Sequence, residues 1–255
     1  MARILLGILS LALVVTGPSV SPPADAGTFL SRQLRAPRVR AALQAQGARV
    51  HDDFLRAGAA WPPSELFMRA FKHESVLEVW AAGAEHPGLV RVWSIPLCAT
   101  SGALGPKRQE GDGQIPEGVY RVNRFNPRSS FHLSLGLDYP NAVDRARAGE
   151  GDPGSDIFVH GDCVTIGCLT IEDGPIERVY LAAIMARDQG QRGLPVHLFP
   201  CRFGEARCEA TLAAEVQHDP SLAPLWRSLR SVHDAFEPTR VVPRVRVTRS
   251  GYRLR

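Results

Sequence analysis

The sequence contains only two lysines, Lys72 and Lys107, so that 28 of its 30 basic residues are arginines. Against 26 acidic residues, the formal charge of +4 is too small to indicate a nucleic-acid partner. Beyond the first residues, no apolar run reaches the ~20 residues that a membrane-spanning helix needs. A hydrophobic share of 44% excludes collagen-like and disordered chains. The composition therefore predicts a globular protein whose function must be argued from a local site.

The first residues have the pattern of a secretory signal peptide. Arg3 precedes an apolar run of 12 residues, 4–15, which is followed by small residues up to Ala26. The run is too short to span a bilayer, which favours cleavage after Ala26, with an uncleaved anchor as the alternative. We therefore expect an exported protein in the periplasm, with no membrane span after cleavage.

The rest of the chain divides into three stretches. Residues 27–64 form an Arg/Ala-rich N-terminal extension, in which 39–46 predict a short helix peripheral to the core. Residues 65–203 carry most of the strand patterns, and residues 204–255 contain a predicted helix at 224–236 and a basic tail. Apolar and alternating segments predict strands at 66–71, 76–82, 89–97, 118–125, 131–137, 157–160 and 196–199.

One further helix is predicted after the last motif, and a long polar connection before it. Apolar residues at Ile176, Val179, Tyr180, Ala183 and Ile184 lie on one helical face, with residue 173 as a candidate cap. Residues 139–153 read as a polar connection that forms a site wall. The sequence therefore predicts a mostly β fold with peripheral helices.

The densest chemistry lies between His160 and Cys168. In one interpretation a cysteine thiolate is the nucleophile and His160 its base, with Gly167 letting the backbone present N–H groups to an oxyanion. In a second, His160, Cys163 and Cys168 bind a metal together with His197 or Cys201, although the spacing is not that of a standard zinc site. In a third, the residues are structural.

These residues resemble a known family. The segment from His160 to Cys168, H-G-D-C-V-T-I-G-C, is similar to the signature of the L,D-transpeptidase catalytic domains (YkuD type), and closest to their YafK branch. Other motifs occur in the family's order over about residues 66–203. They include Gly105-Pro106-Lys107, Glu110-Gly111-Asp112-Gly113-Gln114, Pro116-Glu117-Gly118, Phe131-His132-Leu133-Ser134 and Tyr139-Pro140-Asn141.

The resemblance implies a β-sandwich catalytic domain that acts on peptidoglycan stem peptides at diaminopimelate, without a metal or other cofactor. Cys168 corresponds to the nucleophile, attacking as a thiolate paired with protonated His160. The Gly161 carbonyl would orient His160, and the N–H groups of Gly167 and Cys168 would form the oxyanion hole. Thr165 stands where the family usually has serine, and we expect it to contact substrate.

One departure concerns the substrate carboxylate. Many members carry an arginine two residues after the cysteine, whereas Cys168 is followed by Leu169-Thr170. The YafK branch also lacks this arginine, and it includes an enzyme that hydrolyses the bond between murein and a lipoprotein. Lys107 and Arg108 are candidates to meet the carboxylate instead. Three further residues are expected to line the cleft: Asp112, Glu117 and His132.

Five cysteines allow two disulfides and one free thiol. We expect Cys201 to pair with Cys208, and Cys98 and Cys163 either to pair or to stay buried as thiols, which leaves Cys168 free. The predicted function is an exported cysteine acyltransferase of peptidoglycan. A hydrolase of the same linkages, such as the murein–lipoprotein bond, and an inactive wall-binding module are the alternatives.

Overall fold

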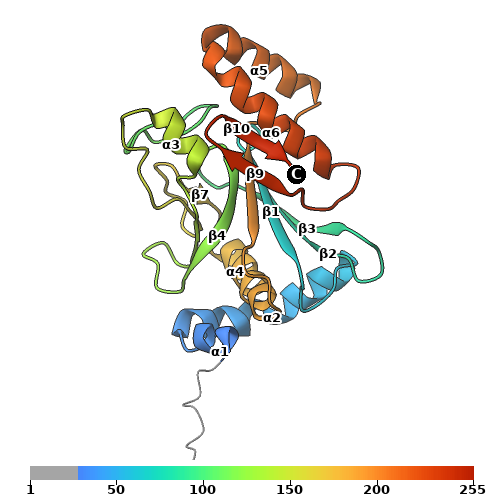
Figure 1. Cartoon of the computed structure of the whole chain (residues 1–255). Helices are drawn as coiled ribbons and strands as arrows, with labels where there is room; N and C mark the ends of the chain where they lie inside the picture. Colours follow the sequence, from blue (N-terminus) through green and yellow to red (C-terminus); the bar gives the residue numbers. More distant parts are fainter. Residues whose placement is uncertain (1–27) are drawn as a thin grey trace, which may run out of the picture.

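A single curled sheet organises the chain, of which the computed structural model describes residues 28–255 (Figure 1). The predicted signal peptide, 1–26, lies outside the described residues. The eight strands run in the order β3-β2-β1-β8-β4-β5-β6-β7. Only the pairs β1–β8 and β6–β7 are parallel within this sheet. The strands are β1 Leu66–Phe71, β2 Val76–Ala82, β3 Leu89–Pro96, β4 Gly118–Asn126, β5 Ser134–Leu137, β6 Phe158–His160, β7 Leu169–Thr170 and β8 Pro195–Phe199.

Strand β1 lies in the interior of the sheet and is buried along its whole length. Its one charged residue, Arg69, is 3% exposed, and its Nε donates to the fully buried Glu78 at 2.6 Å. Burial of a charge requires such a partner, because the desolvation cost is otherwise uncompensated. The alternation of the sequence around Arg69 therefore does not mark a solvent-facing side of the strand.

Helix α4 Asp173–Asp188 connects β7 to β8 and buries the apolar face predicted for it. Residue 173 is the first residue of the helix and not its cap, since the N-cap is Glu172 and makes no side-chain capping bond. Asp173 instead accepts a hydrogen bond from the Asp162 amide at 2.9 Å. The start of α4 thus holds the loop that follows β6.

The helix predicted at 39–46 is present, but it is longer than expected and contributes to the core instead of lying outside it. Helix α2 runs from Pro37 to Arg56, and its Val39, Ala42, Val50 and Phe54 are fully buried in the core. Together with α1 Phe29–Leu34 it packs against α4, at the end of the molecule opposite α5 and α6 (Figure 1). Glycine costs about 1 kcal/mol inside a helix. Burial on both sides of Gly47 outweighs that cost, so the helix continues through it.

The connection at 139–153 contains a helix that the sequence analysis missed, α3 Ala142–Ala148. A capping box begins it: the Asn141 side chain accepts from the Asp144 amide at 3.4 Å, and the Asp144 carboxylate accepts from the Asn141 amide at 2.8 Å; the Asn141 side chain also accepts from the Val143 amide at 2.8 Å. Tyr120 donates to the same Asp144 carboxylate at 2.9 Å. The capping box and the hydroxyl therefore hold α3 against β4.

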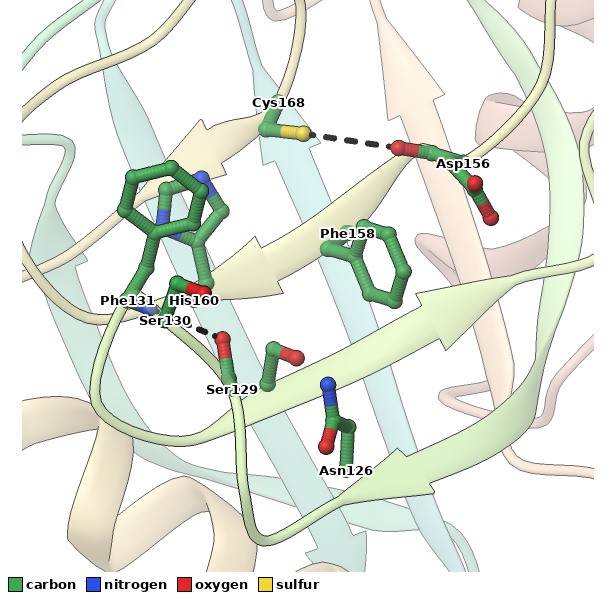
Figure 2. A pocket seen from close by; sticks show the side chains of 9 residues that line it. Asn126, Ser129, Ser130, Phe131, Asp156, Phe158, His160 and Cys168 are labelled. Carbon is green, nitrogen blue, oxygen red and sulfur yellow. Dashed lines mark hydrogen bonds between the residues drawn. The ribbon is translucent and has the colours of Figure 1, made fainter.

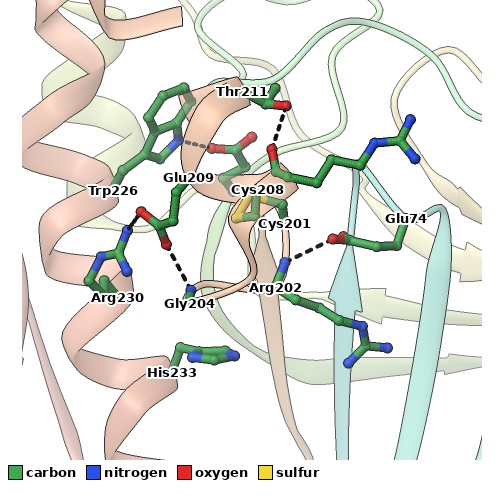
Figure 3. The surroundings of a disulfide bond; sticks show 12 residues. Glu74, Cys201, Arg202, Gly204, Cys208, Glu209, Thr211, Trp226, Arg230 and His233 are labelled. Atoms are coloured by element: carbon green, nitrogen blue, oxygen red, sulfur yellow. Dashed lines mark hydrogen bonds and ion pairs between the residues drawn. A yellow bond between two sulfur atoms is a disulfide. The ribbon is translucent and has the colours of Figure 1, made fainter. Parts of the chain in front are cut away.

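The C-terminal part forms a second core cluster. It comprises α5 Ala206–His218, the 3₁₀ turn η1 Pro220–Leu222, α6 Ala223–Phe236 and a hairpin of β9 Val245–Thr248 with β10 Gly251–Leu254. The predicted helix at 224–236 is confirmed, whereas α5 was not predicted and the end of the basic tail is a hairpin. Figure 3 shows the Cys201–Cys208 disulfide, which joins the end of β8 to α5.

The expected β core with peripheral helices is confirmed. Across residues 28–255, no helix combines the length and the apolar character needed to cross a membrane.

Candidate active site

A cavity of about 320 Å³ opens where β4, β5 and β6 meet the loop before β7 (Figure 2). His160 is the last residue of β6, and Cys168 directly precedes β7. Because β6 and β7 are paired in parallel, the segment between them must return across the sheet edge. Both ends of the predicted motif thereby reach one cavity. Its lining consists of Asn126, Ser129, Ser130, Phe131, Ser134, Asp156, Phe158, His160 and Cys168.

The loop between His160 and Cys168 is held by a disulfide. Cys201 is bonded to Cys208, as expected, and of the two alternatives for Cys98 and Cys163 the structure shows the pair. All five cysteines lie in the described part of the chain, and Cys168 alone among them is free. Cys163 and Cys201 are not available as thiolate ligands, which removes two donors from the metal interpretation.

His160 is oriented by the backbone. Its Nδ1 lies 2.5 Å from the Gly161 carbonyl oxygen, the contact that the resemblance implies. A carbonyl only accepts, so Nδ1 carries the proton and Nε2 keeps a lone pair. The imidazole is 3% exposed and lies 4.8 Å from the Phe131 ring. Burial lowers the pKa of His160, opposed by the hydrogen bond to Gly161 and the charge of Asp162.

Glycine is required at position 167. Its φ of 135° is in the region that side chains rarely adopt, and a Cβ there would lie 2.9 Å from the Gln114 carbonyl oxygen. The N–H groups of Gly167 and Cys168 both donate to the Thr165 hydroxyl oxygen, at 3.1 and 2.8 Å. The hydroxyl in turn donates to the Cys168 carbonyl at 2.8 Å. In this structure, therefore, Thr165 occupies the two N–H groups expected to form the oxyanion hole.

The surroundings of the Cys168 thiol favour its protonated form. Its sulfur points at the main-chain carbonyl of Asp156, to which it donates at 3.7 Å (Figure 2). Burial is the main cause that raises the pKa of Cys168, and the Asp156 charge adds to it, while the Phe158 amide and Lys107 oppose the rise. Burial lowers the pKa of His160 as well, so both shifts act against the expected thiolate–imidazolium pair.

Three of the expected substrate contacts form a loop network outside the cavity lining. The Lys107 ammonium donates to Asp112 at 2.6 Å and to the Gln109 carbonyl at 2.8 Å. Asp112 also accepts from three amides of the same loop. Arg108 reaches away to Asp219 at 3.1 Å. These residues shape the loop beside Gly167, and Lys107 acts on Cys168 through its charge.

Glu117 and His132 also lie outside the cavity lining. Glu117 is fully buried and accepts from the Gly105 amide at 2.7 Å and from the Trp226 indole at 2.6 Å. His132 lies 3.0 Å from Glu177, on helix α4. Their partners connect separate parts of the chain, which is a structural role.

The sequence analysis missed most of the cavity wall. Asn126 ends β4, Ser129 and Ser130 follow it, and Asp156 precedes β6. Phe131 lies within a recognised motif, but its neighbour His132 was chosen for its chemistry. Asp156 directly precedes the strand that ends at His160, and this was the one local signal for it.

Comparison with curated proteins shows the family of this chain. No family model matches the chain. The YafK proteins of Escherichia coli K12 and O157:H7, provisionally named L,D-transpeptidases, are each 32% identical over 191 residues, which cover 74% of this chain and 73% of theirs.

Solved structures resemble the chain only weakly. The helical cell shape determining protein Pgp2 of Campylobacter jejuni is 15% identical with a TM-score of 0.43, covering 74% of this chain and 75% of its own. L,D-transpeptidase 1 of Mycobacterium tuberculosis is 14% identical with a TM-score of 0.30, covering 52% and 61%. Similarities of this size do not establish a relationship. Identity of 32% over nearly three quarters of both chains does establish the relationship with YafK, and the protein therefore belongs to the L,D-transpeptidase family, on its YafK branch.

Proposed function

We propose that this protein is an exported cysteine acyltransferase that acts on peptidoglycan stem peptides at diaminopimelate. The observation that carries the proposal is the pairing of groups in one cavity. Cys168 is the free cysteine of the described chain, and His160 presents to the same cavity a ring whose Nε2 is left as a base. Membership of the L,D-transpeptidase family supports the choice of substrate.

In the first step, the Cys168 sulfur bonds to the carbonyl carbon of the amide at diaminopimelate. The thiol proton passes to Nε2 of His160, and the carbonyl oxygen becomes an oxyanion. The C–N bond then breaks, and His160 returns the proton to the departing amine. A thioester on Cys168 remains.

The oxyanion would bind at the N–H groups of Gly167 and Cys168. These now donate to Thr165, so the oxyanion must replace or share the hydroxyl oxygen. The exchange is favourable, because a hydrogen bond to a charged acceptor contributes about 1.5–3 kcal/mol against about 1 kcal/mol for a neutral one. We infer that Thr165 keeps both amides aligned until the charge develops.

An acceptor then resolves the thioester. An amine gives transpeptidation, and water gives hydrolysis, for which the murein–lipoprotein bond is one candidate linkage. A protein that binds the wall without turnover is the alternative that is not an enzyme. All three leave different products, so one assay separates them.

The test is mass spectrometry of peptidoglycan digests after incubation with the protein or with Cys168→Ala. Crosslinked or exchanged muropeptides would establish transpeptidation, and shortened stems or released peptide would establish hydrolysis. Products that do not differ between the two proteins would contradict the role of Cys168. A Cys201→Ser/Cys208→Ser variant is the matched control, since it removes sulfur far from the cavity along the chain.

We also propose a periplasmic location. The two disulfides support it, because such bonds form and persist in oxidising compartments. Cell fractionation with N-terminal sequencing tests this: the mature chain should begin after Ala26, and a full-length cytoplasmic protein would contradict export.

A further inference from the structure

An ion pair stands at the cavity beside the nucleophile. Arg124, on β4, places its Nη2 3.3 Å from Oδ1 of Asp156. Asp156 lines the cavity, and its main-chain carbonyl accepts the Cys168 thiol (Figure 2). The Arg124 guanidinium lies 5.4 Å from the centre of the Phe158 ring, which lines the same cavity. Asp156 therefore lies beside the reacting sulfur, and its ion pair and the Phe158 ring hold Arg124 against the cavity wall.

This pair contributes little to the fold. The two side chains are 57% and 63% exposed, and exposed pairs contribute at most about 1 kcal/mol. Asp156 has φ of 56°, a left-handed conformation that is uncommon for residues other than glycine. Its negative charge also works against thiolate formation at Cys168. A strained carboxylate that hinders the nucleophile and adds little stability is better explained by a ligand.

The two cations that the sequence offered for the substrate carboxylate are bonded to other carboxylates of the chain: Lys107 to Asp112 and Arg108 to Asp219. The arginine that follows the cysteine in many family members is replaced by leucine and threonine here. Arg124 is the arginine held against the cavity wall by its contacts with Asp156 and Phe158.

We propose that Arg124 and Asp156 bind the free α-amino-acid end of the diaminopimelate side chain, its carboxylate at Arg124 and its ammonium at Asp156. The inference rests on the proposed function and names the substrate feature that the site selects. A zwitterionic carbon carries both charges on neighbouring groups, and it complements an exposed pair of opposite charges. Exchange of the loose ion pair for two charge-assisted contacts costs little.

Binding would also prepare the nucleophile. The ammonium neutralises Asp156, which removes one of the influences that keep the Cys168 thiol protonated. A stem peptide with lysine in place of diaminopimelate offers the ammonium without the carboxylate. The two peptides therefore separate the role of Arg124 from that of Asp156.

The test measures binding by calorimetry in the Cys168→Ala background, where no turnover occurs. The probes are a stem tetrapeptide with meso-diaminopimelate and the matched tetrapeptide with lysine. Arg124→Gln should weaken binding of the first by about 10- to 100-fold and leave the second unchanged. Asp156→Asn should weaken the binding of both peptides. Asparagine readily adopts the positive φ found at this position, so the backbone should be preserved. Arg128→Gln, an exposed arginine outside the cavity lining, is the control and should change neither.

Equal binding of the two peptides by the Cys168→Ala protein, or an Arg124→Gln variant that keeps the preference for diaminopimelate, would overturn the inference. Neither result depends on turnover. The proposed function is judged separately, by the products of the protein that carries Cys168, so each can fail alone. In that protein Asp156→Asn should also shift the pH profile of Cys168 alkylation to lower pH.

Discussion

Removal of the Cys98–Cys163 disulfide should destabilise the protein far more than removal of Cys201–Cys208. The first bond joins residues 65 apart in the sequence and the second joins residues 7 apart. A crosslink restricts the unfolded chain more when it closes a longer loop, and the chain-entropy relation yields about 4 kcal/mol for the first and about 2 kcal/mol for the second. Against a typical total of about 5–15 kcal/mol, the first is a large fraction.

The assay is urea unfolding followed by tryptophan fluorescence, for Cys98→Ser/Cys163→Ser and Cys201→Ser/Cys208→Ser beside the parent. Both variants exchange two sulfurs for hydroxyls, so each serves as the control for the other. The same comparison with the parent under reducing conditions checks that the effect comes from the bond and not from the serines.

The first variant should also lose turnover while it is still folded. Cys163 lies between His160 and Cys168, and its bond to Cys98 ties that loop to the end of β3. A freed loop would fix the positions of His160 and Cys168 relative to one another less tightly. Small misplacements of reacting groups reduce reaction rates by large factors. Equal losses of stability for the two variants, or full turnover without the Cys98–Cys163 bond, would refute this reasoning.

Three other results follow from the site. Thr165→Val should lose about 1–3 kcal/mol of stability and most turnover, because two N–H groups lose their acceptor. Thr165→Ser keeps the hydroxyl and should retain both properties. If the two variants unfold and turn over alike, the role of the hydroxyl is contradicted. Because the pKa of Cys168 is raised, its alkylation rate by iodoacetamide should still increase above pH ~8.5, and a plateau near neutrality would indicate a thiolate–imidazolium pair instead. Burial raises the pKa of Asp144 to about 6, so the folded state binds a proton that the unfolded state releases near pH 4. Stability from this group is present below pH ~4 and is lost as the pH rises to about 6. Asp144→Asn should therefore flatten the change of the unfolding free energy with pH, measured by urea unfolding over this range. An unchanged pH dependence would exclude Asp144 as its origin.

Local patterns in the sequence were sufficient for most of the sheet. The apolar runs at 66–71 and 76–82 became β1 and β2 with the same bounds, and the segment before His160 became β6. The motif from His160 to Cys168 and the oxidising context also predicted which cysteine stays free. These features depend on neighbours in the sequence, because strand patterning and a compact motif are both local.

The tertiary structure alone decided which charged residues are buried and which lie at the cavity. Arg69 and Glu117 are buried because strands and helices distant in sequence surround them, which no local pattern records. Arg124 and Asp156 meet across β4 and the segment before β6, 32 residues apart, and only the curled sheet brings them to the cavity of Cys168. Long-range contacts of this kind depend on how strands are ordered in the sheet. The sequence by itself therefore indicated Cys168 as the candidate nucleophile, and the fold determined which residues line the cavity beside it.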